Sequence, residues 1–426
     1  MPTAAYYTFG CKVNQYETEK IRLEMESRGF DTVRFNAPAD VYVINTCTVT
    51  SVADGKSRHA IRQANRRNPD SVVVVTGCYA ELEPQAILTI PGVDLVFPNA
   101  EKSEIADRLR ARFPDFPARA RPAQELVQQQ RTRAVIKVQD GCDHFCAYCI
   151  VPFARPRKCS RPIDDVLREA EALASHGYKE VVLTGIRLGS YSDSSADTAD
   201  LAREIADIDG IARVRLSSIE PWEATDKLIA VMASSPKICP HLHIPLQSGA
   251  DTVLSRMGRP YDASAYGELI LKLREAVPGI AITTDILVGF PGETDDEFER
   301  CRAFVEEIGF SRLHVFRYSP RRGTRAESMD NHIPERVKER RSRTMIELGA
   351  RLAHDFAKSR VGRTVSVLAE GKRTASGRLS GFTPDYIETE FEASGSDSGR
   401  IVEVIAAEAV GARLIGAKAA GRTAAL

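Results

Sequence analysis

Three cysteines that lie within eight residues of one another restrict the fold of this chain more than any other feature. Cys142, Cys146 and Cys149 have the spacing CxxxCxxC and directly follow a β-rich run. Three thiolates on one tight loop can hold three irons of a cubane cluster. A zinc site usually closes with four ligands, and a zinc knuckle completed by Cys159 or His144 is the alternative interpretation. The spacing predicts a loop at a strand end, with one iron left open to a substrate or cofactor.

Three further cysteines each follow a predicted strand in the N-terminal part. Cys11, Cys47 and Cys78 are far apart in the sequence, but each comes just after a β-rich run. These runs alternate with helical stretches, which predicts a parallel α/β sheet whose strands end at one common edge. We expect the three thiols to meet there and to hold a second cluster with an open iron; three unrelated half-buried cysteines are the alternative. The runs are residues 5–9, 41–45 and 72–76, and the helical stretches are residues 17–27 and 53–67.

The chain divides into three domains of α/β class, separated by a linker and by a change in composition. Residues 1–113 predict a doubly wound parallel sheet, and residues 114–133, rich in Pro and Gln, predict a linker. Residues 134–358 contain six candidate strands, too few for a closed eight-fold barrel, and predict a partial (βα)6 barrel with its site at the strand ends. Residues 359–426 predict a small antiparallel β-barrel. The candidate strands are residues 134–138, 180–184, 213–217, 241–245, 281–288 and 312–316, then 364–369, 377–382, 386–391 and 401–406.

Composition excludes several classes of protein. Lys plus Arg and Asp plus Glu both number 58, so any nucleic-acid site must be a local patch. No apolar run approaches the roughly 20 residues of a membrane helix, and the first ten residues lack the regions of a secretory signal. We therefore expect a cytoplasmic protein without a membrane partner. In that compartment, nine cysteines favour metal ligation or catalysis over disulfides.

The CxxxCxxC loop, with Tyr148 before its last cysteine, resembles the radical S-adenosylmethionine (SAM) superfamily. This resemblance implies that the open iron binds SAM and that the reduced cluster cleaves it to a 5′-deoxyadenosyl radical, with Cys142, Cys146 and Cys149 as the catalytic ligands. Together with Cys11, Cys47 and Cys78 at strand ends, the loop gives the chain a resemblance to the methylthiotransferase family. The resemblance covers nearly the whole chain and includes a C-terminal TRAM-type RNA-binding barrel. The family implies two [4Fe–4S] clusters, two SAM molecules per turnover, and a single-electron donor such as a flavodoxin or ferredoxin.

Motifs after the later predicted strands carry the same resemblance. They are Leu-Thr-Gly-Ile at 183–186, Ser-Ser-Ile-Glu-Pro at 217–221, His-Ile-Pro-Leu-Gln-Ser-Gly at 243–249, and a Thr-Asp-Ile-Leu-Val-Gly-Phe-Pro-Gly segment at 284–292. A Gly-Phe-Pro-Gly turn alone is compatible with an ordinary tight turn, but the order of the motifs at strand ends favours cofactor binding. The implied SAM-binding residues are Tyr148, Thr184, Gly185, Ser217, Glu220, Gln247, Asp285, Val288 and Gly289.

The segment Gly-Cys-Lys-Val-Asn-Gln-Tyr-Glu at 10–17 resembles one branch of this family. That branch converts N6-threonylcarbamoyladenosine at position 37 of tRNA, 3′ of the anticodon, to its 2-methylthio form. The isopentenyladenosine branch has Gln-Met after the first Cys and the ribosomal-protein branch has Pro-Lys, whereas Lys12 and Val13 match neither. Methylthiolation of those two other substrates, and a non-catalytic iron–sulfur carrier or RNA-binding scaffold, are the alternatives. Pro156 replaces the usual family Gly after the cluster loop and stiffens it.

Local charge and aromatic residues indicate where the tRNA anticodon loop binds. Residues 131–161 contain seven Lys or Arg and two Asp or Glu, and residues 317–343 contain nine and four, enough to contact phosphates. For residues 336–343 the alternative is a solvated helix face paired with Glu335 and Glu339. Phe382 and Tyr386 are candidates either for stacking on bases or for filling the small core. At the substrate mouth we expect Arg155, Arg157, Lys158 and Arg161. One chain carries all the expected parts, so we expect a monomer.

Overall fold

A computed structural model describes residues 1–113, 131–194, 196–392 and 395–419. The predicted linker, residues 114–133, lies outside the described residues except for its last three. Two compact units emerge from the contacts within the chain. Unit 1 comprises Met1–Gln129, Asp140–Cys159 and Ser319–Glu327, and unit 2 comprises Gln130–Gln139, Ser160–Tyr318 and Ser328–Leu426. The CxxxCxxC loop therefore groups with the N-terminal part of the chain, whereas the predicted barrel strands belong to unit 2.

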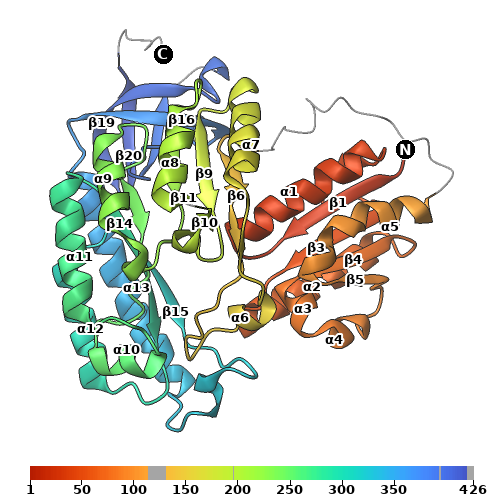
Figure 1. Cartoon of the computed structure of the whole chain (residues 1–426), viewed down its shortest axis with the longest axis horizontal. Helices are drawn as coiled ribbons and strands as arrows, with labels where there is room; N and C mark the ends of the chain where they lie inside the picture. Colours follow the sequence, from red (N-terminus) through yellow and green to blue (C-terminus); the bar gives the residue numbers. More distant parts are fainter. Residues whose placement is uncertain (114–130, 195, 393–394, 420–426) are drawn as a thin grey trace. The chain divides into compact units, whose positions relative to one another are not determined.

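Unit 1 contains a five-stranded parallel sheet in the order β2-β1-β3-β4-β5, with helices on both faces (Figure 1). Alternate residues of its central strand enter two cores. Tyr42 and Ile44 pack with α2 and α4, whereas Val41 and Val43 pack with α1 and α5. Such strands, buried on both faces, confirm the predicted doubly wound sheet. The elements are β1 (Thr3–Thr8), α1 (Lys12–Ser27), β2 (Asp31–Val33), β3 (Val41–Thr46), α2 (Ser51–Arg67), β4 (Val72–Gly77), α3 (Cys78–Leu82), α4 (Pro84–Leu88), β5 (Leu95–Phe97), α5 (Ile105–Arg112) and, after the cluster loop, α6 (Val151–Ala154).

Unit 2 contains the six predicted strands of the central domain, all in parallel pairs. They form two sheets, β6-β9-β12 and β13-β14-β15. Isolated bridges connect Val214 with Ile238 and Ser218 with His243 between the two sheets. Helices lie along the outer side of these strands (Figure 1). The strands are β6 (Ala134–Lys137), β9 (Glu180–Thr184), β12 (Arg213–Leu216), β13 (His241–His243), β14 (Ala281–Val288) and β15 (Arg312–Arg317). The helices are α7 (Ile163–Ser175), α8 (Thr198–Asp207), α9 (Asp226–Ser234), α10 (Asp251–Met257), α11 (Ala263–Ala276), α12 (Asp295–Ile308) and α13 (Glu335–Lys358).

The C-terminal part of unit 2 is a closed five-stranded barrel in the order β16-β17-β18-β20-β19. Four of its five strand pairs are antiparallel, as predicted, but β18 and β20 pair in parallel. Val367, Phe391 and Val404 fill its interior. The strands are β16 (Thr364–Arg373), β17 (Leu379–Phe382), β18 (Glu388–Glu392), β19 (Ile401–Val410) and β20 (Arg413–Lys418), the last of which the sequence did not predict.

Two buried arginines at the start of β12 attach this small barrel to the central strands. Arg215 donates to the carbonyls of Pro384 (2.8 Å) and Thr383 (3.1 Å), and Arg213 donates to the carbonyl of Phe382 (2.9 Å). Glu180 at the start of β9 accepts a hydrogen bond from Arg215 at 2.7 Å, so its carboxylate compensates the buried charge of Arg215. The small barrel therefore contacts the end of these strands opposite to the edge where the site is expected.

Candidate functional site

The three N-terminal cysteines lie at one edge of the unit 1 sheet. Cys11 directly precedes α1, Cys47 follows β3, and Cys78 begins α3 immediately after β4. The strands β1, β3 and β4 are adjacent and parallel, so these positions follow one another across the sheet. Burial, followed by negative charge on Cys78 and Cys11, raises the pKa of the Cys47 thiol to about 11. The three sulfurs are therefore within electrostatic reach of one another, and their binding of a cluster stays a prediction.

Two glycines allow the chain to pass close to these cysteines. A Cβ atom at Gly10 would lie 2.9 Å from the Sγ of Cys47, and the residue has φ +90°. At Gly77, with φ +96°, a Cβ atom would lie 2.3 Å from the carbonyl oxygen of Thr46. Any side chain at either position would collide with the cysteine edge, and this backbone conformation also favours glycine.

The CxxxCxxC loop is held by hydrogen bonds within its own segment of unit 1. The amide of Cys142 donates to the carbonyl of Arg155 (3.3 Å), and the amide of Cys149 donates to the carbonyl of Cys146 (3.0 Å). The amide of His144 lies 3.4 Å from the Sγ of Cys142. His144 therefore contacts the loop through its backbone.

Arg155 connects the two cysteine regions of unit 1 from the interior. The side chain is 3% exposed, and its guanidinium donates to Glu17 (two bonds of 2.8 Å), to Asp140 (2.8 Å) and to Asn14 (2.9 Å). Lys102 also pairs with Glu17. The sequence predicts an RNA contact for Arg155, but its side chain has no surface with which to reach RNA. We correct that interpretation: Arg155 is a buried structural cation.

Asn14, which accepts from Arg155, also binds the backbone beside the cysteine edge. Its amide nitrogen donates to the carbonyls of Phe9 (2.9 Å) and Thr46 (3.0 Å), which lie just before two of the cysteines. The sequence motif at 10–17 points to this region, but charge and spacing alone did not reveal that Asn14 and Glu17 face Arg155. The available signal was their separation of three residues on a helix, which places both side chains on one face.

The residues around the cysteine edge fit a negatively charged group. The Nε of Arg155 is buried and has no hydrogen-bond partner in the described part of the chain. Burial disfavours the charged form of Arg155, but Glu17 and a thiolate at Cys78 outweigh burial and raise its pKa. Thiolate ligands of a cluster carry such negative charge. Within the described ranges, no three His, Cys, Asp or Glu side chains are arranged to hold a single metal ion, so both the cluster ligation and the zinc knuckle stay predictions.

The predicted SAM-binding residues of unit 2 lie at the C-terminal ends of the central strands. Thr184 ends β9, Ser217 follows β12, and Val288 ends β14. The hydroxyl of Ser217 is buried and has no partner within the described ranges, so it is free to bind a ligand. A Cβ atom at Gly185 would lie 2.8 Å from the Oε1 of Gln139, so the chain passes closely there.

The other predicted positions of unit 2 are tied to neighbouring motifs. Glu220 pairs with Arg259, and Asp285 lies 3.3 Å from the Nε2 of His243. Gln247 and Gly289 have φ values of +67° and +75°, conformations that set local turns. Tyr148 belongs to unit 1 with the cluster loop, so its position relative to these residues stays a prediction.

Most of the predicted basic residues are paired with carboxylates. Lys158 pairs with Asp143 (3.1 Å), and Arg161 with Glu169 (2.7 Å), whereas Arg157 is exposed. On α13 the pairs form as the alternative interpretation states, with added partners from α12 and the turn before it. They are Lys338–Glu335, Arg340–Asp295, Arg341–Glu293, Arg343–Glu339 and Arg351–Glu306. Of the four residues predicted at the substrate mouth, Arg157 best keeps that role as a proposal.

Phe382 and Tyr386 are covered by side chains of unit 2. Arg133 lies 4.4 Å from the ring centre of Phe382, and Arg215 lies 4.4 Å from that of Tyr386. The two rings also contact each other at 5.1 Å, and His241 packs on Tyr386 at 4.9 Å. These rings pack at the junction between the small barrel and the central strands, but both are only partly buried, so stacking on RNA bases stays a prediction.

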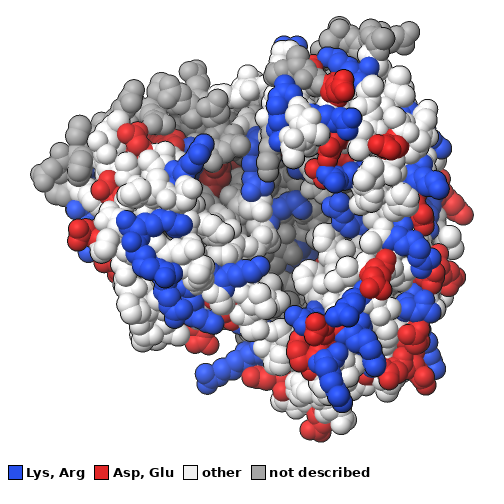
Figure 2. Space-filling model, turned by 180° about the vertical axis from the view of Figure 1, so that it is seen from behind, with Lys and Arg blue, Asp and Glu red and all other residues white. Residues whose placement is uncertain are grey.

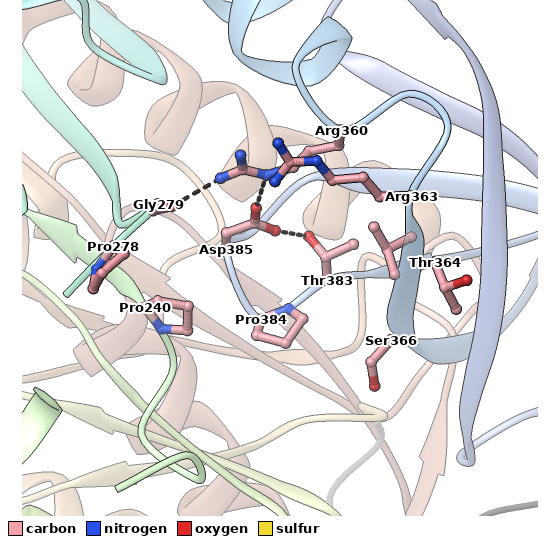
Figure 3. Close-up of a pocket in the computed structure, with 11 residues that line it drawn as sticks. Pro240, Pro278, Gly279, Arg360, Arg363, Thr364, Ser366, Thr383, Pro384 and Asp385 are labelled. Atoms are coloured by element: carbon pink, nitrogen blue, oxygen red, sulfur yellow. Dashed lines mark hydrogen bonds and ion pairs between the residues drawn. The ribbon is translucent and has the colours of Figure 1, made fainter. Parts of the chain in front are cut away.

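A cavity of about 290 Å³ lies beside the same junction in unit 2 (Figure 3). Arg360 crosses it, donating to Asp385 (2.8 Å) and to the carbonyl of Gly279 (2.8 Å), while Asp385 accepts from Thr383. Its lining contains no cysteine and none of the strand-end residues named above. We therefore assign the cavity no catalytic role.

The remaining cysteines lie outside both sets. Cys239 and Cys301 are buried in the core of unit 2, and Cys159 is exposed. Burial raises the pKa of Cys239 to about 12, which keeps its thiol neutral and unreactive. No helix in the described ranges is both long and apolar enough to cross a membrane.

Two regions of the chain match models of known protein families. Residues 3–98 match the family described as Uncharacterized protein family UPF0004, and residues 136–305 match the radical SAM superfamily. A radical SAM methyltransferase, TsrM of Kitasatospora setae, has a similar fold with a TM-score of 0.55 and 18% identity, over 74% of this chain and 75% of that one. Fold and site thus define a radical SAM enzyme, a class that implies SAM and a [4Fe–4S] cluster.

Curated relatives narrow this class. The threonylcarbamoyladenosine tRNA methylthiotransferase MtaB of Bacillus subtilis is 42% identical over 95% of this chain and 93% of its own, and the protein of that name from Thermotoga maritima is 39% identical over 92% of each. A tRNA-2-methylthio-N(6)-dimethylallyladenosine synthase of Carboxydothermus hydrogenoformans is 35% identical over 95% and 97%. The chain belongs to the methylthiotransferase family of radical SAM enzymes.

Proposed function

We propose that this enzyme converts N6-threonylcarbamoyladenosine at position 37 of tRNA to its 2-methylthio derivative. The observation that carries the proposal is the 42% identity to the Bacillus subtilis enzyme of that name, over 95% of this chain. Segment 10–17 supports it, because Lys12 and Val13 differ from the pairs found in the other two branches. The reaction takes place in the cytoplasm, where the tRNA is found.

In this proposal, each of the two sets of cysteines holds one cluster with its own role. Cys142, Cys146 and Cys149 hold one [4Fe–4S] cluster with an iron open to SAM, and Cys11, Cys47 and Cys78 hold a second. When bound, the clusters and two SAM molecules supply the one-electron and methyl-transfer chemistry that replaces an unactivated C–H bond, which side-chain acids and bases cannot do. A flavodoxin or ferredoxin supplies the electrons.

The chain's own residues orient the reactants. Ser217 offers its buried hydroxyl to SAM, with Thr184, Gly185, Glu220, Gln247, Asp285, Val288 and Gly289 at the same strand ends. Arg155 and Lys102 offset the negative charge of thiolates at the edge of the unit 1 sheet. The adenine must be turned out of the anticodon loop, and single-stranded bases permit this at low cost.

Nucleoside mass spectrometry of tRNA tests the proposal. The host lacks its own methylthiolation of threonylcarbamoyladenosine, and this gene is added back as wild type or as Cys142→Ala. We expect the 2-methylthio derivative with the wild type only. Unmodified threonylcarbamoyladenosine beside a new 2-methylthio derivative of isopentenyladenosine would assign the chain to the other tRNA branch.

A further inference from the structure

The helix α2 of unit 1 carries a basic face that the function described above does not use. It contains five Lys or Arg residues and one acidic residue, Asp54. Asp54 is buried and accepts hydrogen bonds from Thr48 (2.6 Å) and Arg321 (2.7 Å). The one carboxylate of the helix is therefore occupied within unit 1, and it does not neutralise the exposed side.

The polar and apolar residues of α2 occupy opposite sides of the helix. Ala60, Ile61 and Ala64 are buried in the core of unit 1. At 3.6 residues per turn, the side opposite to them carries only basic or uncharged residues. The basic ones are Lys56, Arg58, His59, Arg62 and Arg66, of which all but the partly buried Arg58 are exposed.

The cations of α2 lack the carboxylate partners that those of α13 have. No ion pair joins Lys56, Arg62 or Arg66 to an acidic residue within the described ranges. Arg58 donates instead to the hydroxyl of Tyr79 (3.1 Å). On the side of unit 1 seen at the left of Figure 2, Lys and Arg side chains form a curved band with few acidic residues in it. Unpaired cations of this density attract a polyanion.

We propose that this α2 face binds the phosphate backbone of the tRNA substrate. The inference rests on the proposed function, because it names where that substrate is held. The helix begins at Ser51, four residues after Cys47, so the face extends from the cysteine edge along roughly 25 Å of unit 1. Phosphate contacts position a nucleic acid without reading its bases, so the choice of base stays with the cysteine edge.

The test measures the affinity of the cluster-loaded enzyme for the threonylcarbamoyladenosine-containing tRNA over a range of salt concentrations. The variant combines Lys56→Gln, Arg62→Gln and Arg66→Gln, which are surface changes that break no ion pair. We expect weaker binding at every salt concentration, and a slope of log K against log salt that is smaller by about two because three phosphate contacts are lost. SAM cleavage without RNA should match the wild type.

A matched control removes three cations that have carboxylate partners in unit 2: Arg302→Gln, Arg343→Gln and Arg351→Gln. It lowers the net charge equally, and we expect it to keep the wild-type salt slope. An α2 variant with wild-type affinity and slope would overturn the inference, as would an equal loss in the control. If the wild type itself fails to bind this tRNA at any salt concentration, the proposed substrate is wrong and the inference falls with it.

Discussion

The two cysteine sets of unit 1 are built in opposite ways. Cys142, Cys146 and Cys149 belong to one loop that its own backbone hydrogen bonds hold. The other set comes from three strands that are neighbours in the sheet but distant in the sequence. Spacing alone therefore predicts the loop set, whereas the edge set depends on the order of the strands in the sheet.

The largest expected effect concerns the loop set. Cys142→Ala should abolish both SAM cleavage and methylthiolation, because two thiolates cannot hold three irons of the cluster. Chromatography of 5′-deoxyadenosine and mass spectrometry of the nucleoside measure the two losses. Cys159→Ala, at an exposed cysteine of the same segment, serves as the control and should keep both activities. SAM cleavage at the wild-type rate in Cys142→Ala would contradict the assignment.

The edge set should separate the two activities. Cys11→Ala should abolish methylthiolation but leave SAM cleavage, since the loop set stays complete. The same two assays measure this result, together with the iron content of the purified variant, which should fall by about half because one of two equal clusters is lost. Loss of both activities together would mean that the two sets do not have separate roles.

Much of the fold was predictable from the sequence because its signals are local. The strands at 180–184 and 281–288 have the predicted bounds, since short apolar runs that are rich in β-branched residues and bounded by turns favour strands. The edge strands β2 and β5 have three residues each, too few to show a period. Strand β20 contains Gly416, where an added Cβ atom would lie 2.3 Å from the carbonyl oxygen of Ile405. In the sequence alone, this glycine indicates the end of a strand.

The site was predictable where it depends on thiols and not where it depends on charge. A cysteine at a strand end is informative wherever the strand lies, but an arginine can face solvent, RNA or a carboxylate. Arg155 is buried and Lys158 is paired, whereas the α2 face, which no prediction included, carries unpaired cations. Partners such as Glu17 come from 138 residues away, and only the tertiary fold brings them together.

Removing Arg155, the buried cation between the two cysteine regions of unit 1, tests how much it stabilises them. Arg155→Ala removes the buried guanidinium that donates to Glu17, Asp140 and Asn14, and breaking a buried pair in this way costs about 3 kcal/mol or more. Denaturant unfolding of the metal-free protein measures the change. Arg155→Lys should recover part of it, because lysine keeps the charge but loses the planar fork. Arg157→Ala, next to it but exposed, should stay within about 0.5 kcal/mol of the wild type.

The edge set should also depend on the close backbone approach at Gly77. Gly77→Ala places a Cβ atom 2.3 Å from the carbonyl oxygen of Thr46 at φ +96°, and should cost about 2 kcal/mol or more. Gly177→Ala has a similar φ of +88° but nothing within 4 Å, so it should cost only the conformational strain of about 1 kcal/mol. Denaturation midpoints of the two variants measure the difference, and equal midpoints would show that the close approach is not required.

The last prediction tests whether the cysteine regions depend on unit 2. Glu180 is fully buried at the start of β9; burial raises its pKa, but Arg215 and Arg213 outweigh burial and lower it. Because the folded pKa lies below the unfolded value of about 4.3, the stability from this pair is complete above that pH and is lost as the pH falls through the folded pKa. Glu180→Gln should therefore be less stable than the wild type at pH 7 and should lose less stability between pH 5 and pH 3.

Thermal unfolding at a series of pH values measures this difference, and subtracting the variant from the wild type removes the contribution of other carboxylates. Identical pH dependence in both proteins would show that the Glu180 pair does not stabilise unit 2 in this way. Since both cysteine sets belong to unit 1, the iron content at pH 7 should not change in Glu180→Gln. A loss of iron in that variant would contradict this expectation, because it would show that the cysteine sets of unit 1 need the central strands for their stability.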